Sequence, residues 1–248
     1  MRKGKCATAG AVAVLAMLGA AAPAMAAKVV AVDGVSKSDA SKRVEILVVV
    51  GKDESARAAK ARALEAQHAK PAPPTPTSNA YSFTGLRWDA LPVRQYYNPA
   101  GERAAGAQTA LTNTHPAWSN VSGSTYRIGF GGTTARCPSI VRECPGAQRT
   151  DGFNDVGWAQ LSNGTLGVTW STSNPDEADM AISTRYGWTT GCTQQGSAID
   201  LQSVMLHENG HVAGLGHSSD INAVMYPSYQ TARCSLGTDD RAGLAALY

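Results

Sequence analysis

Histidine and cysteine are rare in this chain, and lysine is confined to its N-terminal part. These limits restrict the classes of site and fold that the sequence can form. The 248 residues include 5 histidines and 5 cysteines. The cysteines form no C-x-x-C motif, which argues against a cysteine-rich zinc module. Lysine is absent after Lys70. Beyond the N-terminal leader, no apolar run is long enough to cross a membrane, so we expect no membrane span.

The N-terminus has the pattern of a secretory leader. Residues 2–5 carry three basic side chains, and residues 9–22 form an apolar stretch that is short for a bilayer. Residues 24–26 read Ala-Met-Ala, which is a typical cleavage pattern. We therefore expect residues 1–26 to be a signal peptide, and the product to be secreted into the extracellular space or a periplasm.

Residues 27–78 differ from the rest of the chain in charge. They carry 9 Lys and Arg against 6 acids, whereas residues 79–248 carry 10 Arg against 13 acids. Residues 71–78 read PAPPTPTS, which indicates an extended linker. A basic leading segment before an acidic remainder indicates a propeptide that docks on the main domain. A solvated tail or a small anchoring module is the alternative.

The patterning of apolar residues predicts strands and helices in both parts. In the leading segment we expect strands over residues 28–32 and 44–50 and a helix over residues 54–70. In the main domain we expect strands over 93–97, 126–130, 166–170 and 178–183, a helix over 102–113 and a closing helix over 239–248. The 170 residues from 79 to 248 are enough for one domain of mixed α+β class.

One run, which begins at His207, reads HENGHVAGLGH and matches the pattern H-E-x-x-H-x-x-G-x-x-H. On a helix, His207 and His211 lie on one face and can bind one ion. Gly214 can adopt the left-handed conformation that ends the helix, so that His217 reaches the same ion. Three neutral imidazoles and one open position describe a catalytic zinc site. Glu208 is placed to act as the general base towards a water at that site.

The residues around this run also favour a helix. Residues 197–200 have the S-x-x-D form of a helix start. Gly210 is unfavourable in the middle of a helix, and a close backbone approach by another element would explain it.

A second run, residues 223–229, reads AVMYPSY. Together with the histidine motif and Ser218 directly after it, this run resembles the metzincin metallopeptidases, and within them the matrixins of peptidase family M10, as a secreted bacterial-type protease. The resemblance implies a zincin-like catalytic domain over residues 79–248, with a mixed twisted sheet, an active-site helix and a C-terminal helix. It also implies that Met225 is the Met-turn residue, and that Pro227 and Tyr229 line the substrate pocket.

The resemblance further implies a secreted zinc-dependent endopeptidase that acts on protein or peptide substrates. One zinc ion would be bound by His207, His211 and His217, with Glu208 as the general base. The strand over 166–170, through Leu166 and Val168, would be the sheet edge that pairs with the substrate backbone.

The chain departs from the family pattern in one residue of the motif and in the lack of a propeptide cysteine. Asn209 stands where matrixin-like motifs usually have an apolar residue. Many matrixins silence their zymogen with a propeptide cysteine that binds the zinc, but residues 27–136 contain no cysteine. His68 or an acid of the leading segment would have to cap the metal instead, and the sequence singles out none of them.

Two other functions are compatible with the same sequence. One alternative is a secreted zinc-binding or adhesion protein on a metzincin scaffold without turnover, and another is a zinc hydrolase that acts on a non-peptide substrate. We expect no nucleic-acid partner and a monomer. Calcium (Ca2+) is a further candidate ligand of two acidic groups, although such acids are more often solvated turn residues; the groups are Asp176, Glu177 and Asp179, and Asp151 and Asp155.

Four cysteines remain once the leader, with Cys6, is removed. An even number in an exported chain favours disulfides, although four cysteines allow three pairings. We prefer Cys137–Cys144, which would close a short loop. The second pair would then be Cys192–Cys234, which would join the segment before the histidine motif to the segment after residues 223–229.

Overall fold

The computed structural model describes residues 29–38, 42–51, 53–71, 80–139, 150–172 and 176–248. The expected leader and most of the Pro-rich linker lie outside these residues. No helix in the described ranges is long and apolar enough to span a membrane. The strands are β1 (Val29–Ser36), β2 (Lys42–Val49), β3 (Ala69–Pro71), β4 (Val93–Tyr97), β5 (Ile128–Thr133), β6 (Asn154–Ala159), β7 (Thr165–Thr172), β8 (Ala178–Ser183), β9 (Trp188–Thr189) and β10 (Ile199–Asp200). The helices are α1 (Ala56–Ala66), α2 (Ala107–Ser119), α3 (Leu201–Val212) and α4 (Thr238–Leu247).

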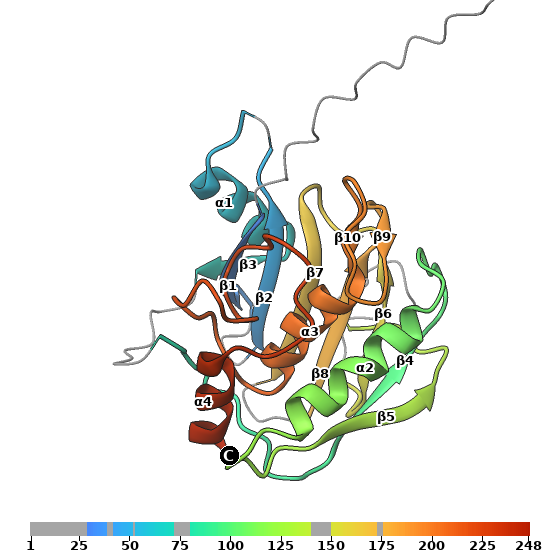
Figure 1. Ribbon diagram of the computed structural model, residues 1–248. Coiled ribbons are helices and arrows are strands. Elements are labelled where there is room, and N and C mark those ends of the chain that lie inside the picture. Colours follow the sequence, from blue (N-terminus) through green and yellow to red (C-terminus); the bar gives the residue numbers. More distant parts are fainter. Residues whose placement is uncertain (1–28, 39–41, 52, 72–79, 140–149, 173–175) are drawn as a thin grey trace, which may run out of the picture.

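One mixed sheet of eight strands organises the molecule, in the order β3-β1-β2-β7-β8-β6-β4-β5 (Figure 1). From β8 to β5 the neighbouring strands run parallel. β7 is antiparallel to β8, and β2 is antiparallel to β7. The α+β class and the mixed sheet are therefore confirmed.

The leading segment continues this sheet and does not form a separate layer. β1 and β2 are antiparallel, and together with β3 they extend the sheet beyond β7. β7 is thus the outermost strand of the part after residue 79, but it is an interior strand of the whole chain. In the full chain β2 pairs along the side of residues 166–170 at which we expect a substrate to pair.

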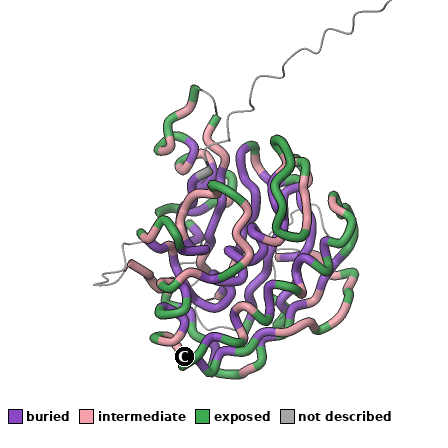
Figure 2. Tube along the Cα trace, in the orientation of Figure 1, coloured by how far each residue is buried: buried purple, intermediate pink, exposed green. Residues whose placement is uncertain are grey.

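Each face of the sheet is covered by its own apolar cluster. On one face, α2 and α3 pack over residues such as Leu166 and Met180 (Figure 1), and Leu244 of α4 joins the same cluster. On the other face, Ala59, Ala63 and Leu64 of α1 pack over residues such as Val168. The alternation of strand side chains between the two clusters follows from the two-residue period of a strand. The buried residues concentrate in the central strands and in α3 (Figure 2).

Several sequence-based bounds are confirmed and others need correction. The strands over 93–97 and 178–183 have the expected bounds. The helix expected over 102–113 is α2. It begins after Gly106, whose backbone is in the left-handed conformation, and it continues through Pro116. β6 was missed, because its sequence NDVGWA has no alternation and all six residues are buried. Interior strands of parallel sheets lose the alternating pattern in this way.

The disulfide Cys192–Cys234 joins the segment before α3 to the segment that precedes α4. This pair is confirmed. The other expected pair includes Cys144, which lies outside the described residues.

Candidate metal centre

α3 carries the first two histidines of the motif into the interior of the domain. Its N-cap is Asp200, whose carboxylate accepts a hydrogen bond of 2.7 Å from the backbone N–H of Ser203. Residues 197–200 are therefore not the first turn that their S-x-x-D form predicted, because Ile199–Asp200 pairs as β10 before the helix begins. Residues 203–212 of the helix are all buried, which fixes the direction in which the motif side chains point.

The three histidines of the motif converge on one point. The ring centroids of His207, His211 and His217 are separated by 4.7 to 5.3 Å. Each ring offers a nitrogen, and these nitrogens lie within 4.8 Å of one another. His207 and His211 are buried, and His217 is nearly so. The convergence that the spacing predicts is therefore present.

The protonation of the rings shows that this point suits a cation. The Nδ1 atoms of His207 and His211 lie 2.8 Å from the carbonyls of Val224 and Leu215, so each Nδ1 must carry the proton. Burial, followed by the charge of His217, lowers the pKa of His207 to about 3, which keeps its ring neutral. The two Nε2 lone pairs therefore face each other at 3.0 Å. A divalent ion between them relieves this repulsion, so these residues fit zinc.

Gly214 turns the chain so that His217 can reach the other two histidines. Its φ is +98°, in the left-handed region, and it directly follows the helix C-cap. A side chain there would collide with the carbonyl of Leu86. The hydroxyl of Ser82 donates to the carbonyl of His217 at 2.7 Å. His217 Nε2 is buried and has no hydrogen-bond partner among the described residues, which leaves it free for an ion.

Glu208 is fully buried beside the histidines and is held by the sheet. Its Oε2 accepts a 2.6 Å hydrogen bond from the hydroxyl of Thr169 on β7. Its Oε1 has no partner within the described ranges. A Cβ at Gly167 would lie 2.7 Å from that Oε1, so the glycine makes room for the carboxylate. Burial raises the pKa of Glu208 to about 8, and the Thr169 hydrogen bond opposes this rise. Nothing in the local sequence pointed to Thr169 or Gly167.

Met225 packs against the middle of α3. It is buried, and a Cβ added at Gly210 would overlap its Sδ and approach Trp118. The close approach that would explain a glycine in this helix therefore comes from side chains, not from another backbone. Asp240 of α4 holds this turn, because its carboxylate accepts from the N–H groups of Val224 and Met225 at 2.7 and 3.0 Å.

Asn209, the departure from the family pattern, belongs to a buried polar network. Its Oδ1 accepts from Gln95 Nε2 at 2.8 Å, and its Nδ2 donates to the Thr114 hydroxyl at 2.6 Å. Gln95 Oε1 then accepts from His115 Nε2 at 2.9 Å. The amide therefore ties α3 to β4 and α2, and it is fully satisfied in the interior.

Of the other expected substrate-site residues, Tyr229 lines a small cavity of about 30 Å³. Tyr229 lines it together with His207 and Val224, and Leu47 of β2 also lines it. The Tyr229 hydroxyl accepts from the N–H of Asp200 at 3.0 Å, which fixes one side of the cavity. The side chains of Leu166 and Val168 are buried on opposite faces of β7, so only the backbone of this strand could bind a peptide.

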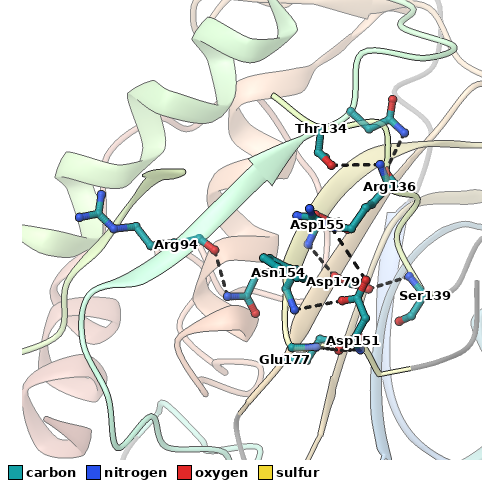
Figure 3. A network of polar contacts seen from close by, with 12 residues as sticks. Arg94, Thr134, Arg136, Ser139, Asp151, Asn154, Asp155, Glu177 and Asp179 are labelled. Carbon is teal, nitrogen blue, oxygen red and sulfur yellow. Dashed lines mark hydrogen bonds and ion pairs between the residues drawn. The ribbon is translucent and has the colours of Figure 1, made fainter. Parts of the chain in front are cut away.

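Four of the acids considered for calcium lie in one network of polar contacts (Figure 3). The fifth, Asp176, accepts a hydrogen bond of 2.7 Å from the Thr172 hydroxyl. Asp155 pairs with Arg136 at 2.8 Å. The two carboxylate oxygens of Asp179 accept backbone N–H groups of Asp155 and Ser139, each at 2.6 Å. Glu177 accepts from the N–H of Gly152 at 2.8 Å. Burial raises the pKa of Asp179 to about 8. Their acceptor capacity is thus used by protein groups, and the described acids here do not gather as a metal-binding set.

Two carboxyl groups of the leading segment also reach the metal centre. Asp33 of β1 contacts His217 Nδ1 through its Oδ1, and Asp33, Glu45 and His217 form a second group that could hold an ion. Burial and the neighbouring Asp33 raise the pKa of Glu45. His68, the other residue considered as a cap, lines a different cavity together with Trp170 and Glu177.

Comparisons with known proteins agree with this geometry. The matrixin family model matches residues 153–248. Metalloendoproteinase 4-MMP of Arabidopsis thaliana is 38% identical over 101 residues, which are 39% of this chain and 30% of the relative. Matrix metalloproteinase-25 of Mus musculus is 30% identical over 178 residues, which are 68% of this chain and 28% of the relative. Interstitial collagenase of Bos taurus is 30% identical over 176 residues, which are 70% of this chain and 34% of the relative.

The matched part therefore spans about a third or less of the length of these relatives. They are plant and animal proteins, and they give no support to the expectation of a bacterial-type protease. A matrixin match implies dependence on zinc, in agreement with the three converging imidazoles. The chain is a matrixin-like member of peptidase family M10.

Proposed function

We propose that this protein is a secreted zinc endopeptidase in which His207, His211 and His217 hold the ion and Glu208 is the general base. The observation that carries the proposal is the pair of Nε2 lone pairs that face each other at 3.0 Å beside a buried carboxylate. A structural zinc site would close the coordination shell with a fourth protein ligand from the same domain. Within the described part of residues 79–248, only the three histidines converge on this point.

Zinc bound there supplies a Lewis acid that polarises the peptide carbonyl and acidifies a water. Glu208 Oε1, which has no protein partner in the described residues, can take the proton from the attacking water and pass it to the leaving amine. The Thr169 hydroxyl fixes the other oxygen at 2.6 Å, so the carboxylate keeps one orientation through both transfers.

The substrate would bind as an added strand along β7, with its backbone paired to that strand. The cavity lined by Val224 and Tyr229 would accept the side chain that follows the cleaved bond. Pro227 and Tyr229 form one wall in this proposal, and Met225 supports the floor from beneath α3. Leu166 and Val168 contribute through their backbones.

The leader and the segment up to residue 78 complete the proposal. Residues 1–26 would direct export, and residues 27–78 would be a propeptide whose release activates residues 79–248. A zinc-binding protein without turnover is the alternative. It is the weaker candidate, because Glu208 is present and all three histidines converge.

Casein cleavage with and without a metal chelator tests the proposal. The full chain is folded intact and then cut at a single protease site introduced into residues 72–78. We expect the cut protein to cleave casein, to lose this activity in the chelator and to regain it when zinc is restored. A cut, folded and zinc-loaded protein that leaves casein and gelatin intact would contradict the peptidase function.

A further inference from the structure

Strand β2 lies where a peptide substrate would bind. It pairs along β7 from Lys42 opposite Thr172 to Val48 opposite Thr165, so it takes up the backbone groups on that side of β7. Its Leu47 is buried and points into the cavity lined by Val224 and Tyr229. The leading segment therefore occupies both the strand position and the side-chain pocket that a substrate needs.

Strand β1 fills the opposite side of the same cleft. The N–H of Ala31 donates to the carbonyl of Pro227 at 2.6 Å, and the neighbours of Pro227, Tyr226 and Ser228, line the proposed substrate pocket. β1 and β2 pair with each other from Val29 to Val35. The β1–β2 hairpin thus spans the cleft from β7 on one side to the Pro227 segment on the other.

The hairpin brings two carboxyl groups to the metal centre. Asp33 and Glu45 lie directly opposite each other in the β1–β2 pairing, and together with His217 they form a group that could hold an ion. Asp33 Oδ1 contacts the His217 ring. Glu45 is 3% exposed, and its Oε2 has no hydrogen-bond partner within the described residues. A buried carboxyl oxygen without a donor is costly, and an ion nearby would offset that cost.

We propose that the β1–β2 hairpin is an autoinhibitory segment that covers the metal centre, with Asp33 as the carboxylate that anchors it there through His217. This inference rests on the proposed peptidase function. It names the device that a cysteine-free leading segment requires, because residues 27–136 contain no cysteine. Asp33 and Glu45 supply oxygen ligands, which zinc also accepts. Leu47 and the β2–β7 pairing hold the hairpin in place while these carboxyls lie beside His217.

The test measures access to the metal in the full chain loaded with cobalt in place of zinc. Co(II) has a visible spectrum that changes when a new ligand binds, whereas zinc has filled d orbitals and no such spectrum. Acetohydroxamate, a small chelating ligand, is the probe. The half-saturating concentration of acetohydroxamate in Asp33→Ala should be at least about tenfold lower than in wild type, as expected if the covered state excludes the probe from most molecules.

Three further variants control this measurement. Asp53→Ala makes the same change at an exposed position of the leading segment and should match wild type. Asp33→Asn keeps the side-chain shape but removes the charge, so it should fall between wild type and Asp33→Ala. Leu47→Ala weakens the packing of the hairpin in the cavity lined by Val224 and Tyr229. It should therefore also lower the half-saturating concentration of acetohydroxamate. Circular dichroism confirms that each variant is folded, and Asp33→Asn preserves the test if Asp33→Ala does not fold.

Equal half-saturating concentrations in wild type, Asp33→Ala and Asp33→Asn would overturn the proposal. Casein cleavage, measured on the same proteins and on the chain cut in residues 72–78, separates this failure from failure of the peptidase function. If the cut chain cleaves casein but the Asp33 variants do not change probe access, autoinhibition by Asp33 is refuted and the peptidase stands. If Asp33→Ala opens the cobalt site but no form cleaves casein, the peptidase function fails and the anchoring role of Asp33 stands.

Discussion

Gly210 and Met225 are in such close contact that a side chain at residue 210 would occupy the space of the Met225 sulfur. The contact joins the middle of α3 to the turn that follows the histidine motif. Both residues are buried, and Trp118 of α2 closes the same space. A residue that disfavours a helix is therefore required here, because the turn must pack directly under the two helical histidines.

Gly210→Ala should destabilise the protein even though alanine favours a helix by about 1 kcal/mol over glycine. Overpacking of a buried site costs about 1–3 kcal/mol, and the Met225 sulfur has little space to move. Urea unfolding measures the change. In a double-mutant cycle, Gly210→Ala should lower the free energy of unfolding by less in the Met225→Ala background than in wild type. An increase in stability of about 1 kcal/mol for Gly210→Ala alone would show that the contact is not tight.

Thr169→Val should lower kcat by about tenfold to a hundredfold, because loss of a hydrogen bond behind a metal-site group has effects of this size. The hydroxyl donates to Glu208 Oε2 at 2.6 Å, and valine has nearly the same shape without the donor. Steady-state kinetics on the cut protein should show a change in kcat with little change in KM, and an unchanged zinc content. Thr169→Ser should restore most of the activity. Loss of zinc in Thr169→Val would instead indicate a collapsed site.

Asp240→Ala should lower the free energy of unfolding by about 2–3 kcal/mol, because buried backbone N–H groups lose a charged acceptor. Its carboxylate accepts from Val224, Met225 and Gly237. Asp239→Ala is the matched control on the same helix, since Asp239 accepts a side-chain hydrogen bond from Ser218 at 2.5 Å. Thermal or urea unfolding compares the two variants. Equal, small losses in both would contradict the assigned role of Asp240 in holding the Met225 turn.

His115 should make the protein less stable in mild acid. Burial lowers its pKa to about 4, whereas an unfolded histidine titrates near 6.5. Between these values the unfolded state binds a proton that the folded state does not, so stability falls as the pH drops from about 6.5 to about 4. The loss from this group is about 2–3 kcal/mol.

His115→Gln removes this titration while keeping a polar side chain next to Gln95. The difference in unfolding free energy between wild type and His115→Gln, followed by urea unfolding across this pH range, isolates the contribution of His115. It should shift in favour of the variant as the pH falls. Parallel stability curves would show that His115 takes up its proton as readily in the folded state as in the unfolded state.

The histidine motif was readable from the sequence because its ligands lie close together along one helix and one turn. The spacing alone placed His207 and His211 on one face of a helix. Gly214 adopts the left-handed conformation that the motif predicted. Cys192–Cys234 and the strands over 93–97 and 178–183 were also predicted correctly. Each of these depends on local pattern or on a small number of alternatives.

The residues that contact Glu208 and His217 from other elements could not be predicted from local sequence patterns. Thr169 is 39 residues from Glu208, and their contact depends on how α3 lies against β7. Asp33 reaches His217 only because β2 adds to β7 and β1 then crosses to the Pro227 segment. Such contacts depend on strand register, and a shift of one residue would turn every side chain to the other face. β6 was missed for a related reason, since burial on both faces removes its alternation.

The most direct test of the account compares zinc content and casein cleavage in Glu208→Ala and His211→Ala, each cut in residues 72–78 after folding. Glu208→Ala should bind as much zinc per chain as wild type and lose hydrolysis, because the three imidazoles remain while the general base is gone. His211→Ala should lose both zinc and hydrolysis. Cleavage at the wild-type rate by Glu208→Ala, with its zinc content unchanged, would contradict the mechanism.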